Sequence, residues 1–136
     1  MAVFVIDASL AASWCFPDER TEYTNGILVA VSKAIEVAAP RLWAYELRNS
    51  VLMGIRRKRI TKADAQEFLE SIEAFHILLS DPPSYDSVFA LAERHGLTVY
   101  DAAYLELAAR EHLPLASLDK ELCRAAVQSG VLLFDP

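Results

Sequence analysis

Short apolar runs alternate along this chain with stretches whose apolar residues recur every three or four positions. The runs predict buried strands at 3–7, 35–39, 76–79, 115–118 and 131–134. The periodic stretches predict helices at 8–16, 19–33, 42–57, 63–75, 84–95, 102–110 and 121–129. Strands and helices in this alternation predict an α/β fold, a three-layer α/β/α sandwich around a mostly parallel central sheet.

Residues that begin or end helices support these boundaries. Pro17 ends the first helical stretch, and Thr61 followed by Asp64 has the spacing of a capped helix start. Gly96 and Gly130 are expected to end the helices that precede them. The chain has 136 residues and no linker, repeat or low-complexity segment. We therefore expect one domain over 1–136.

Four acidic residues lie where the predicted pattern changes between strand and helix. Asp7 and Asp119 directly follow predicted strands, Asp101 opens a helix, and Glu46 lies in the first turns of another. In a parallel sheet the carboxyl ends of the strands form the usual ligand-binding edge, so the fold can bring these acids together. Each acid alone has an ordinary alternative: a helix cap for Asp101 and Asp119, a turn residue for Asp7, and a solvated helix position for Glu46.

Gathered carboxylates repel one another unless a hard cation neutralises them, so the pattern predicts a Mg²⁺ or Mn²⁺ site suited to phosphodiester chemistry. Ser9, two residues after Asp7, is a candidate to hold a water or a phosphate oxygen. Ser117 and, more weakly, Asn49 are candidates for the same role. For the serines, a hydroxyl that bonds to nearby backbone is an equally good interpretation.

Composition and charge restrict the partners. Hydrophobic residues make up 54% of the chain, which indicates a well-filled core or, in addition, an apolar dimer or partner interface. The net charge of −6 disfavours broad, sequence-independent binding of nucleic acid, but an acidic cleft loaded with cations can still attract phosphate. The basic run 56–59 fits the end of a helix, or a contact with RNA or a partner.

Several other classes of protein do not fit. The sequence lacks the glycine-rich loops of nucleotide-binding sites, the G-x-S-x-G of hydrolases and any zinc-ligand spacing. No apolar run is long enough for a membrane span, and the first residues do not resemble a signal peptide. Cys15 and Cys123 fit buried thiols in a reducing cytoplasm, where we expect the protein to be located.

Four segments together resemble the motifs of PIN-domain ribonucleases, specifically the VapC-type toxins of toxin–antitoxin modules. The segments are VFVIDAS at 3–9, APRLWAYELRNSVL at 39–52, LTVYDAAYLELA at 97–108 and LPLASLDKEL at 113–122. One departure is Ser117, where threonine is commoner. The resemblance implies Ser9 as a supporting catalytic residue, and it implies that the catalytic and metal-binding acids are Asp7, Glu46, Asp101 and Asp119.

The resemblance further implies a homodimeric, Mg²⁺- or Mn²⁺-dependent endoribonuclease that is inhibited by a VapB-type antitoxin. A basic antitoxin residue would pair with the carboxylates, and an apolar segment would fill a neighbouring groove. Trp14, Phe16 and Trp43 are candidate anchors for that segment, with core packing as the alternative role for at least one of them. Two alternatives stay open at this point. One is a PIN-domain nuclease of RNA processing outside a toxin–antitoxin module, and the other is a non-catalytic interaction module.

Overall fold

The computed structural model describes residues 2–34 and 36–136. Its strands are β1 (Val5–Ile6), β2 (Val37–Pro40), β3 (Ile77–Ser80) and β4 (Leu115–Ala116). Its helices are α1 (Ala8–Ser13), α2 (Glu22–Lys33), α3 (Leu42–Arg56), α4 (Lys62–Glu73), α5 (Tyr85–His95), α6 (Val99–Glu111) and α7 (Lys120–Gln128), and a short 3-10 helix covers Pro17–Glu19. The alternation of strands and helices predicted from the sequence is confirmed.

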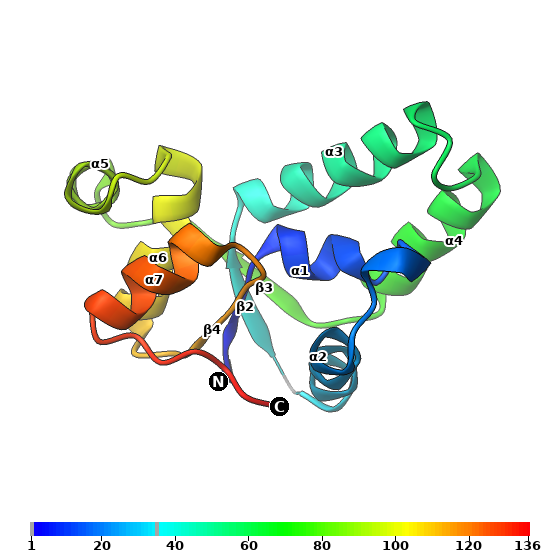
Figure 1. Cartoon of the computed structure of the whole chain (residues 1–136). Helices are drawn as coiled ribbons and strands as arrows, with labels where there is room; N and C mark the ends of the chain where they lie inside the picture. The colour runs from blue at the N-terminus through cyan, green and yellow to red at the C-terminus, as the bar shows by residue number, and fades with distance from the viewer. Residues whose placement is uncertain (1, 35) are drawn as a thin grey trace.

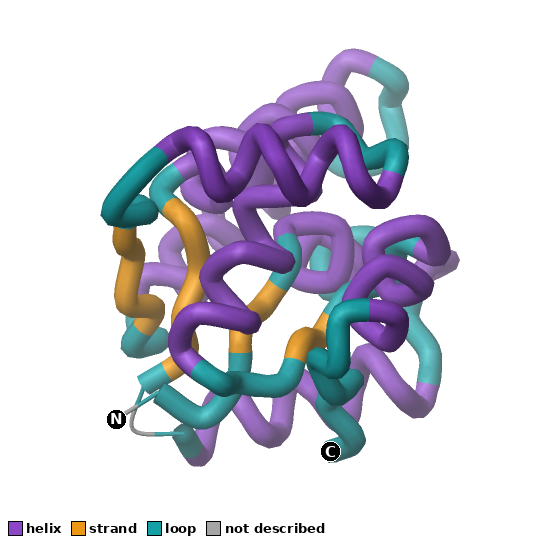
Figure 2. Tube along the Cα trace, turned by 90° about the vertical axis from the view of Figure 1, so that its left-hand side faces the viewer, coloured by secondary structure: helices purple, strands orange, loops and turns teal. Residues whose placement is uncertain are grey.

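The strands form one parallel sheet in the order β3-β2-β1-β4, with helices around it (Figure 2). Val5 of the central strand pairs with Ala38 on one side and with Leu115 on the other. The pairing continues past β1, because the amide of Asp7 donates to the carbonyl of Ala116 at 2.9 Å. This register sets the last residues of β1 and β4 side by side at the carboxyl edge of the sheet.

Helices cover both faces of the sheet, as predicted. Helix α6 packs on β1, β2 and β4, and α5 and α7 pack on α6. Figure 1 shows these three helices on one side of the strands and α1 to α4 on the other. The core between the layers holds fully buried side chains such as Phe4, Ile6, Leu10, Leu47 and Leu115. The apolar composition is thus largely accounted for by a filled three-layer core.

The predicted strands differ from the structure in their extent. The runs 3–7 and 115–118 shorten to the two-residue strands β1 and β4, and the remaining differences concern 131–134 and 35–39. The run 131–134 is not a full strand: Leu133 forms an isolated parallel bridge with Leu115, supported by a 2.8 Å bond from the Leu115 amide to the Leu132 carbonyl. Leu132 and Leu133 are exposed, so this segment lacks the burial that would extend the pairing. The run 35–39 is shifted to β2, and its first residue lies outside the described residues.

Side-chain caps explain where several helices begin. Helix α2 starts at Glu22, later than predicted, because Thr21 and Thr24 form a reciprocal capping box that defines its first turn. Thr61 caps α4 through the Asp64 amide as expected. The predicted end of α5 is confirmed, since Gly96 has the left-handed φ of 65°. No helix of the described chain is long and apolar enough to cross a membrane.

Candidate active site

The carboxyl edge of the sheet gathers the beginnings of several helices. Asp7 lies between β1 and α1, and Asp119 lies just after β4 at the N-cap of α7. The start of α3 and the segment that leads into α7 lie at this same end of the strands (Figure 1). The acids predicted from the sequence therefore come from elements that converge on one edge.

Asp7 is a buried carboxylate held by two hydroxyl groups. Its side chain is 5% exposed, and its Oδ2 accepts hydrogen bonds from Ser9 Oγ at 2.7 Å and Ser117 Oγ at 2.6 Å. Asp7 occupies the N-cap position of α1, but its side chain forms no capping bond there. The two hydroxyls orient this carboxylate, and a backbone hydrogen bond with Ser9, of the kind that a turn residue makes, also lowers its pKa.

Ser117 connects Asp7 to Asp119. While its hydroxyl donates to Asp7, the same oxygen accepts from the Asp119 amide at 3.0 Å. Asp119 also caps α7, since its Oδ1 accepts from the Leu122 amide at 3.0 Å. The cap interpretation of Asp119 is thus correct, and the cap holds its carboxylate near the Asp7 side of the edge.

Glu46 and Asp101 approach from the two helix layers. Glu46, half-buried in α3, accepts a 2.6 Å hydrogen bond on its Oε1 from the hydroxyl of Tyr104 in α6. Asp101 lies in the first turn of α6 but is not its cap; Thr98 caps the helix by accepting from the Asp101 amide at 3.1 Å. The cap interpretation of Asp101 is therefore wrong, and its carboxylate is not required by the helix start.

The charges of these acids interact. Burial raises the pKa of Asp7, and the charge of Asp119 raises it further, while the hydroxyls of Ser117 and Ser9 partly offset the shift. Burial raises the pKa of Glu46 and of Asp101 as well, with added contributions from Asp7 to both, from Asp101 to Glu46 and from Asp119 to Asp101. The charges of the four carboxylates interact, and the raised pKa values of Asp7, Glu46 and Asp101 show that this group favours the uptake of a cation.

The donor chemistry of this group suits a hard divalent cation. Carboxylate and hydroxyl oxygens are the ligands that Mg²⁺ and Mn²⁺ prefer, and no thiol or imidazole is among the predicted site residues. Within 2–34 and 36–136, however, no three acidic, histidine or cysteine side chains form a compact ligand group. The set therefore fits a cation held by one or two carboxylates and waters better than one enclosed by protein ligands.

Tyr104 is a site residue that the sequence pattern did not single out. It is fully buried, and burial together with its bond to Glu46 raises the pKa of its phenol, so it stays protonated and donates. A tyrosine in an alanine-rich helix has the pattern of a core residue. The sequence feature that could have identified Tyr104 as a site residue is its position three residues after Asp101, on the same side of α6.

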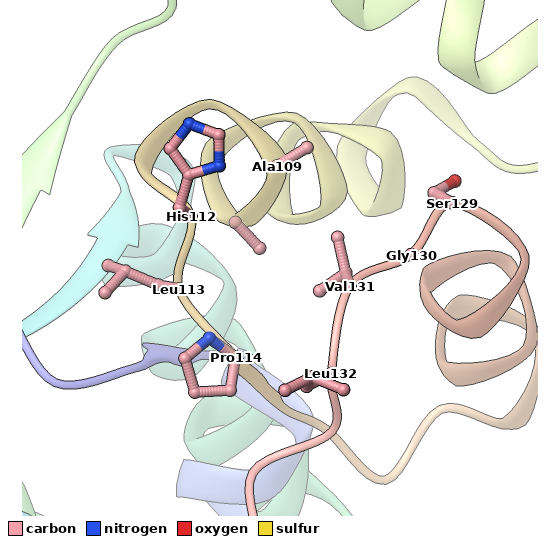
Figure 3. A pocket seen from close by; sticks show the side chains of 9 residues that line it. Ala109, His112, Leu113, Pro114, Ser129, Gly130, Val131 and Leu132 are labelled. Atoms are coloured by element: carbon pink, nitrogen blue, oxygen red, sulfur yellow. The ribbon is translucent and has the colours of Figure 1, made fainter.

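A hollow in the surface lies away from the acids. It has a volume of about 370 Å³ between the end of α6 and the C-terminal segment, and Figure 3 shows His112, Pro114 and Val131 around it. Pro114 directly precedes β4, so this hollow lies at the amino end of that strand. It holds no acidic lining residue and is separate from the candidate active site.

A comparison with known proteins identifies the family. The family model described as the PIN domain matches residues 4–128, which is most of the chain. The chain belongs to the PIN-domain family. The predicted family resemblance is thereby confirmed, and each of the acids of the carboxyl edge lies within the matched range.

Curated relatives place this PIN domain near the VapC proteins. It is 39% identical over 122 residues to Ribonuclease VapC3 of Pyrobaculum aerophilum, covering 87% of this chain and 90% of that protein. It is 34% identical over 87 residues to Exonuclease VapC9 of the same organism, covering 64% and 65% of the two chains. These relatives confirm the predicted resemblance to VapC-type nucleases.

Solved structures agree with the fold. The crystal structure of PAE2754 from Pyrobaculum aerophilum superposes with a TM-score of 0.71 at 30% identity, covering 92% of this chain and 87% of that one. FitAcB from Neisseria gonorrhoeae gives a TM-score of 0.67 at 20% identity, with 98% of both chains covered. At this low identity, the second likeness concerns the fold alone.

The raised pKa of Asp7 gives a prediction about stability. Its folded-state pKa lies above the ordinary value of 3.8, so the free energy of unfolding decreases as the pH rises from about that value through the folded-state pKa. We expect Asp7→Asn to be more stable than wild type at pH 7 in EDTA, and this advantage to shrink on acidification. Urea unfolding across pH measures it, with the exposed Asp135→Asn as a charge-matched control. Equal pH profiles for all three proteins would contradict the burial argument.

The bond between Tyr104 and Glu46 predicts coupling between α6 and α3. Tyr104→Phe keeps the ring and removes the hydroxyl, which should lower the free energy of unfolding by about 1–3 kcal/mol for a buried bond to a carboxylate. The same change in a Glu46→Gln background should have a smaller effect. A double-mutant cycle by urea unfolding measures this coupling. Additive effects would show that the two side chains do not depend on each other.

Proposed function

We propose that this PIN domain, one nuclease domain over residues 1–136, is a toxin endoribonuclease of a type II toxin–antitoxin system. It hydrolyses RNA phosphodiester bonds and depends on Mg²⁺ or Mn²⁺. The observation that carries the proposal is Asp7, a buried carboxylate that two serine hydroxyls orient and whose charge interacts with those of Glu46, Asp101 and Asp119. The names of the relatives, a ribonuclease and an exonuclease, support nuclease chemistry for this site.

The metal ligands in this proposal are four carboxylates, acting directly or through waters: Asp7, Glu46, Asp101 and Asp119. A bound divalent ion would activate a water and offset the negative charge that develops at phosphorus. The protein's own contribution is to position these groups. Ser9 and Ser117 fix one oxygen of Asp7, and Tyr104 fixes one oxygen of Glu46. Such preorganised groups need little rearrangement during the reaction.

The same acidic edge supports an antitoxin as partner. A guanidinium or ammonium group of a VapB-type antitoxin can pair with the carboxylates in place of a cation. The predicted aromatic anchors are wrong, because Trp14, Phe16 and Trp43 are buried in the core. Exposed apolar side chains are instead found directly before three of the acids: Tyr45 at 80%, Tyr100 at 65% and Leu118 at 40% exposure. This apolar rim is the surface that an antitoxin segment would cover.

The predicted homodimer and the cytoplasmic location stay predictions. Tyr85 and Phe89, both exposed on α5, add apolar surface outside the acidic edge that a second copy could cover. The four intact acids, together with the nuclease names of the relatives, favour an enzyme over a non-catalytic interaction module.

The central test is metal-dependent RNA cleavage. Purified protein is incubated with a circular RNA, which has no ends and therefore reports endonucleolytic cleavage, in Mg²⁺, in Mn²⁺ or in EDTA. We expect cleavage in either metal and none in EDTA. Asp7→Asn should reduce the rate by at least about 100-fold, the scale of losing one well-placed electrostatic group. Asp135→Asn, which removes the same charge from an exposed position, should cleave normally. Cleavage that persists in EDTA would rule out the metal mechanism.

The partner proposal predicts that inhibition needs both charge and apolar contact. The antitoxin is sought as the product of a short reading frame beside this gene, and its effect on cleavage is measured. Replacing its basic residues near the acidic edge by alanine should weaken inhibition, as should Tyr100→Ala in the toxin. Tyr100→Phe, which keeps the ring, should be inhibited normally. If the antitoxin without these basic residues inhibits as well as the native one, charge pairing is wrong and only steric blocking remains.

A further inference from the structure

A groove runs from the candidate active site along helix α3. It has a volume of about 300 Å³, and its lining comes from α1, α3, the 3-10 helix and the basic segment after α3. Ser9 and Ala12 contribute from α1, and Asn49, Ser50 and Met53 contribute from α3. This hollow is distinct from the one in Figure 3, which lies by the amino end of β4.

One end of the groove is at the acids. Ser9, which lines the groove, donates the 2.7 Å hydrogen bond to Asp7. Along α3, residues that line the groove follow Glu46 at spacings that keep them on one side of the helix. The last of them, Arg57, comes eleven residues after Glu46, which is three helical turns or about 16 Å. The groove therefore leads from the carboxylates to a cation at the other end of the helix.

Of the two basic side chains that line the groove, one is paired with acidic residues and the other is not. Its ionisable lining residues are Glu19, Arg57 and Arg59. Arg59 pairs with Glu19 at 2.7 Å and with Asp18 at 3.0 Å, and its guanidinium lies 4.2 Å from the centroid of the Phe16 ring. Arg57 is exposed, and its side chain makes no hydrogen bond or ion pair within the described chain. The groove thus presents one unengaged cation, although the whole protein carries a charge of −6.

Close packing between Gly54 and Phe16 fixes the part of the groove that lies next to Arg57 in the sequence. Gly54 faces the ring of Phe16 so closely that a Cβ at position 54 would lie 2.6 Å from its Cζ. Phe16 is buried, and Arg59 covers it from outside. Helix α3 and the 3-10 helix are therefore held in contact, so the groove is a built feature of the fold with little freedom to collapse or widen.

We propose that this groove binds the RNA strand on one side of the scissile phosphate, with Arg57 as a backbone phosphate contact. The inference rests on the proposed function, because it requires RNA at the acids. A polyanionic strand that leaves a carboxylate-lined centre needs a cation at its next contact, and Arg57 is the cation that the groove supplies. Asn49 and Ser50 add neutral hydrogen-bonding groups between the two ends. The groove positions the backbone and need not read the sequence.

Arg56 provides a matched control for Arg57. It is the preceding residue, is exposed like Arg57 and carries the same charge, but it does not line the groove. The experiment compares Arg57→Ala, Arg57→Lys and Arg56→Ala in the full chain. The probe is a fluorescent single-stranded RNA of about 12 nucleotides, within the usual footprint of strand-binding grooves. Binding is measured in an Asp7→Asn background to prevent cleavage, and kcat and KM are measured without that change.

We expect Arg57→Ala to raise the Kd and the KM by about 10-fold, the scale of one lost hydrogen bond to a charged group, with kcat little changed. The slope of log Kd against log salt should fall by about 0.7, the value for one phosphate contact to a single strand. Arg57→Lys should recover most of the binding, and Arg56→Ala should behave like the parent protein.

The outcomes separate this inference from the proposed function. If the wild type does not cleave RNA, the proposed function fails before the groove is tested. If the wild type cleaves RNA but Arg57→Ala and Arg56→Ala bind the probe equally, the groove is not the path of the strand. That result overturns the inference even if Arg57→Ala weakens binding of an acidic peptide or of the antitoxin, since Arg57 would then serve a protein partner.

Discussion

The candidate site depends on keeping one carboxylate, that of Asp7, buried at the end of a central strand. Removing an ionised group from water is unfavourable unless hydrogen bonds replace the lost solvation. Ser9 and Ser117 supply these bonds. Ser9 is local, two residues along α1, but Ser117 reaches Asp7 only because β4 lies beside β1 in the observed register. A shift of β4 by one residue would turn the Ser117 side chain away and leave the carboxylate with a single hydroxyl.

The remaining acids illustrate how a negatively charged edge can be built at tolerable cost. Asp101 and Asp119 lie at or near helix N-termini, where the helix dipole favours a negative charge. Asp119 also performs a structural task as a cap, so its place is secured by folding itself. Asp7 and Glu46 form no such cap and depend on hydroxyl donors, although Asp7 also lies at the N-terminus of α1. The carboxylates of the site therefore still repel one another, and a bound cation or a basic partner can relieve this repulsion. The same repulsion that lowers the stability of the empty site favours the binding that its proposed chemistry needs.

An acidic protein that acts on RNA needs its basic side chains, which attract the phosphates, to lie apart from the acidic side chains that repel them. Here the four acids of the candidate site lie at the carboxyl edge, whereas α3 ends in the basic run 56–59. Ion pairs engage Arg59 with the 3-10 helix, which leaves Arg57 as the cation facing the groove. This arrangement explains how a net charge of −6 is compatible with a local path for a polyanion. The prediction that the basic run forms a helix end also holds, since the Arg57 amide donates a hydrogen bond that closes the last turn of α3.

The sequence by itself determined the class of fold and singled out the acids of the candidate site as a prediction. Hydrophobic periodicity reports burial within one element, so the alternation of strands and helices could be predicted from it, and so could the positions of Asp7, Asp101 and Asp119 beside element boundaries. The match of residues 4–128 to the PIN model agrees with this interpretation. Element boundaries were predicted less well, because caps such as Thr21 depend on individual side-chain bonds.

Only the tertiary structure decided which side chains meet. The bond from Tyr104 to Glu46 joins two helix layers, and the bond from Ser117 to Asp7 joins two strands that are far apart in sequence. The run 131–134 has the composition of a strand but gains only one bridge, because β4 is short and Leu132 and Leu133 stay exposed. Periodicity carries no information about register or about contacts between distant elements. Those are fixed by how the whole core packs, and the geometry of the candidate site is set at that level.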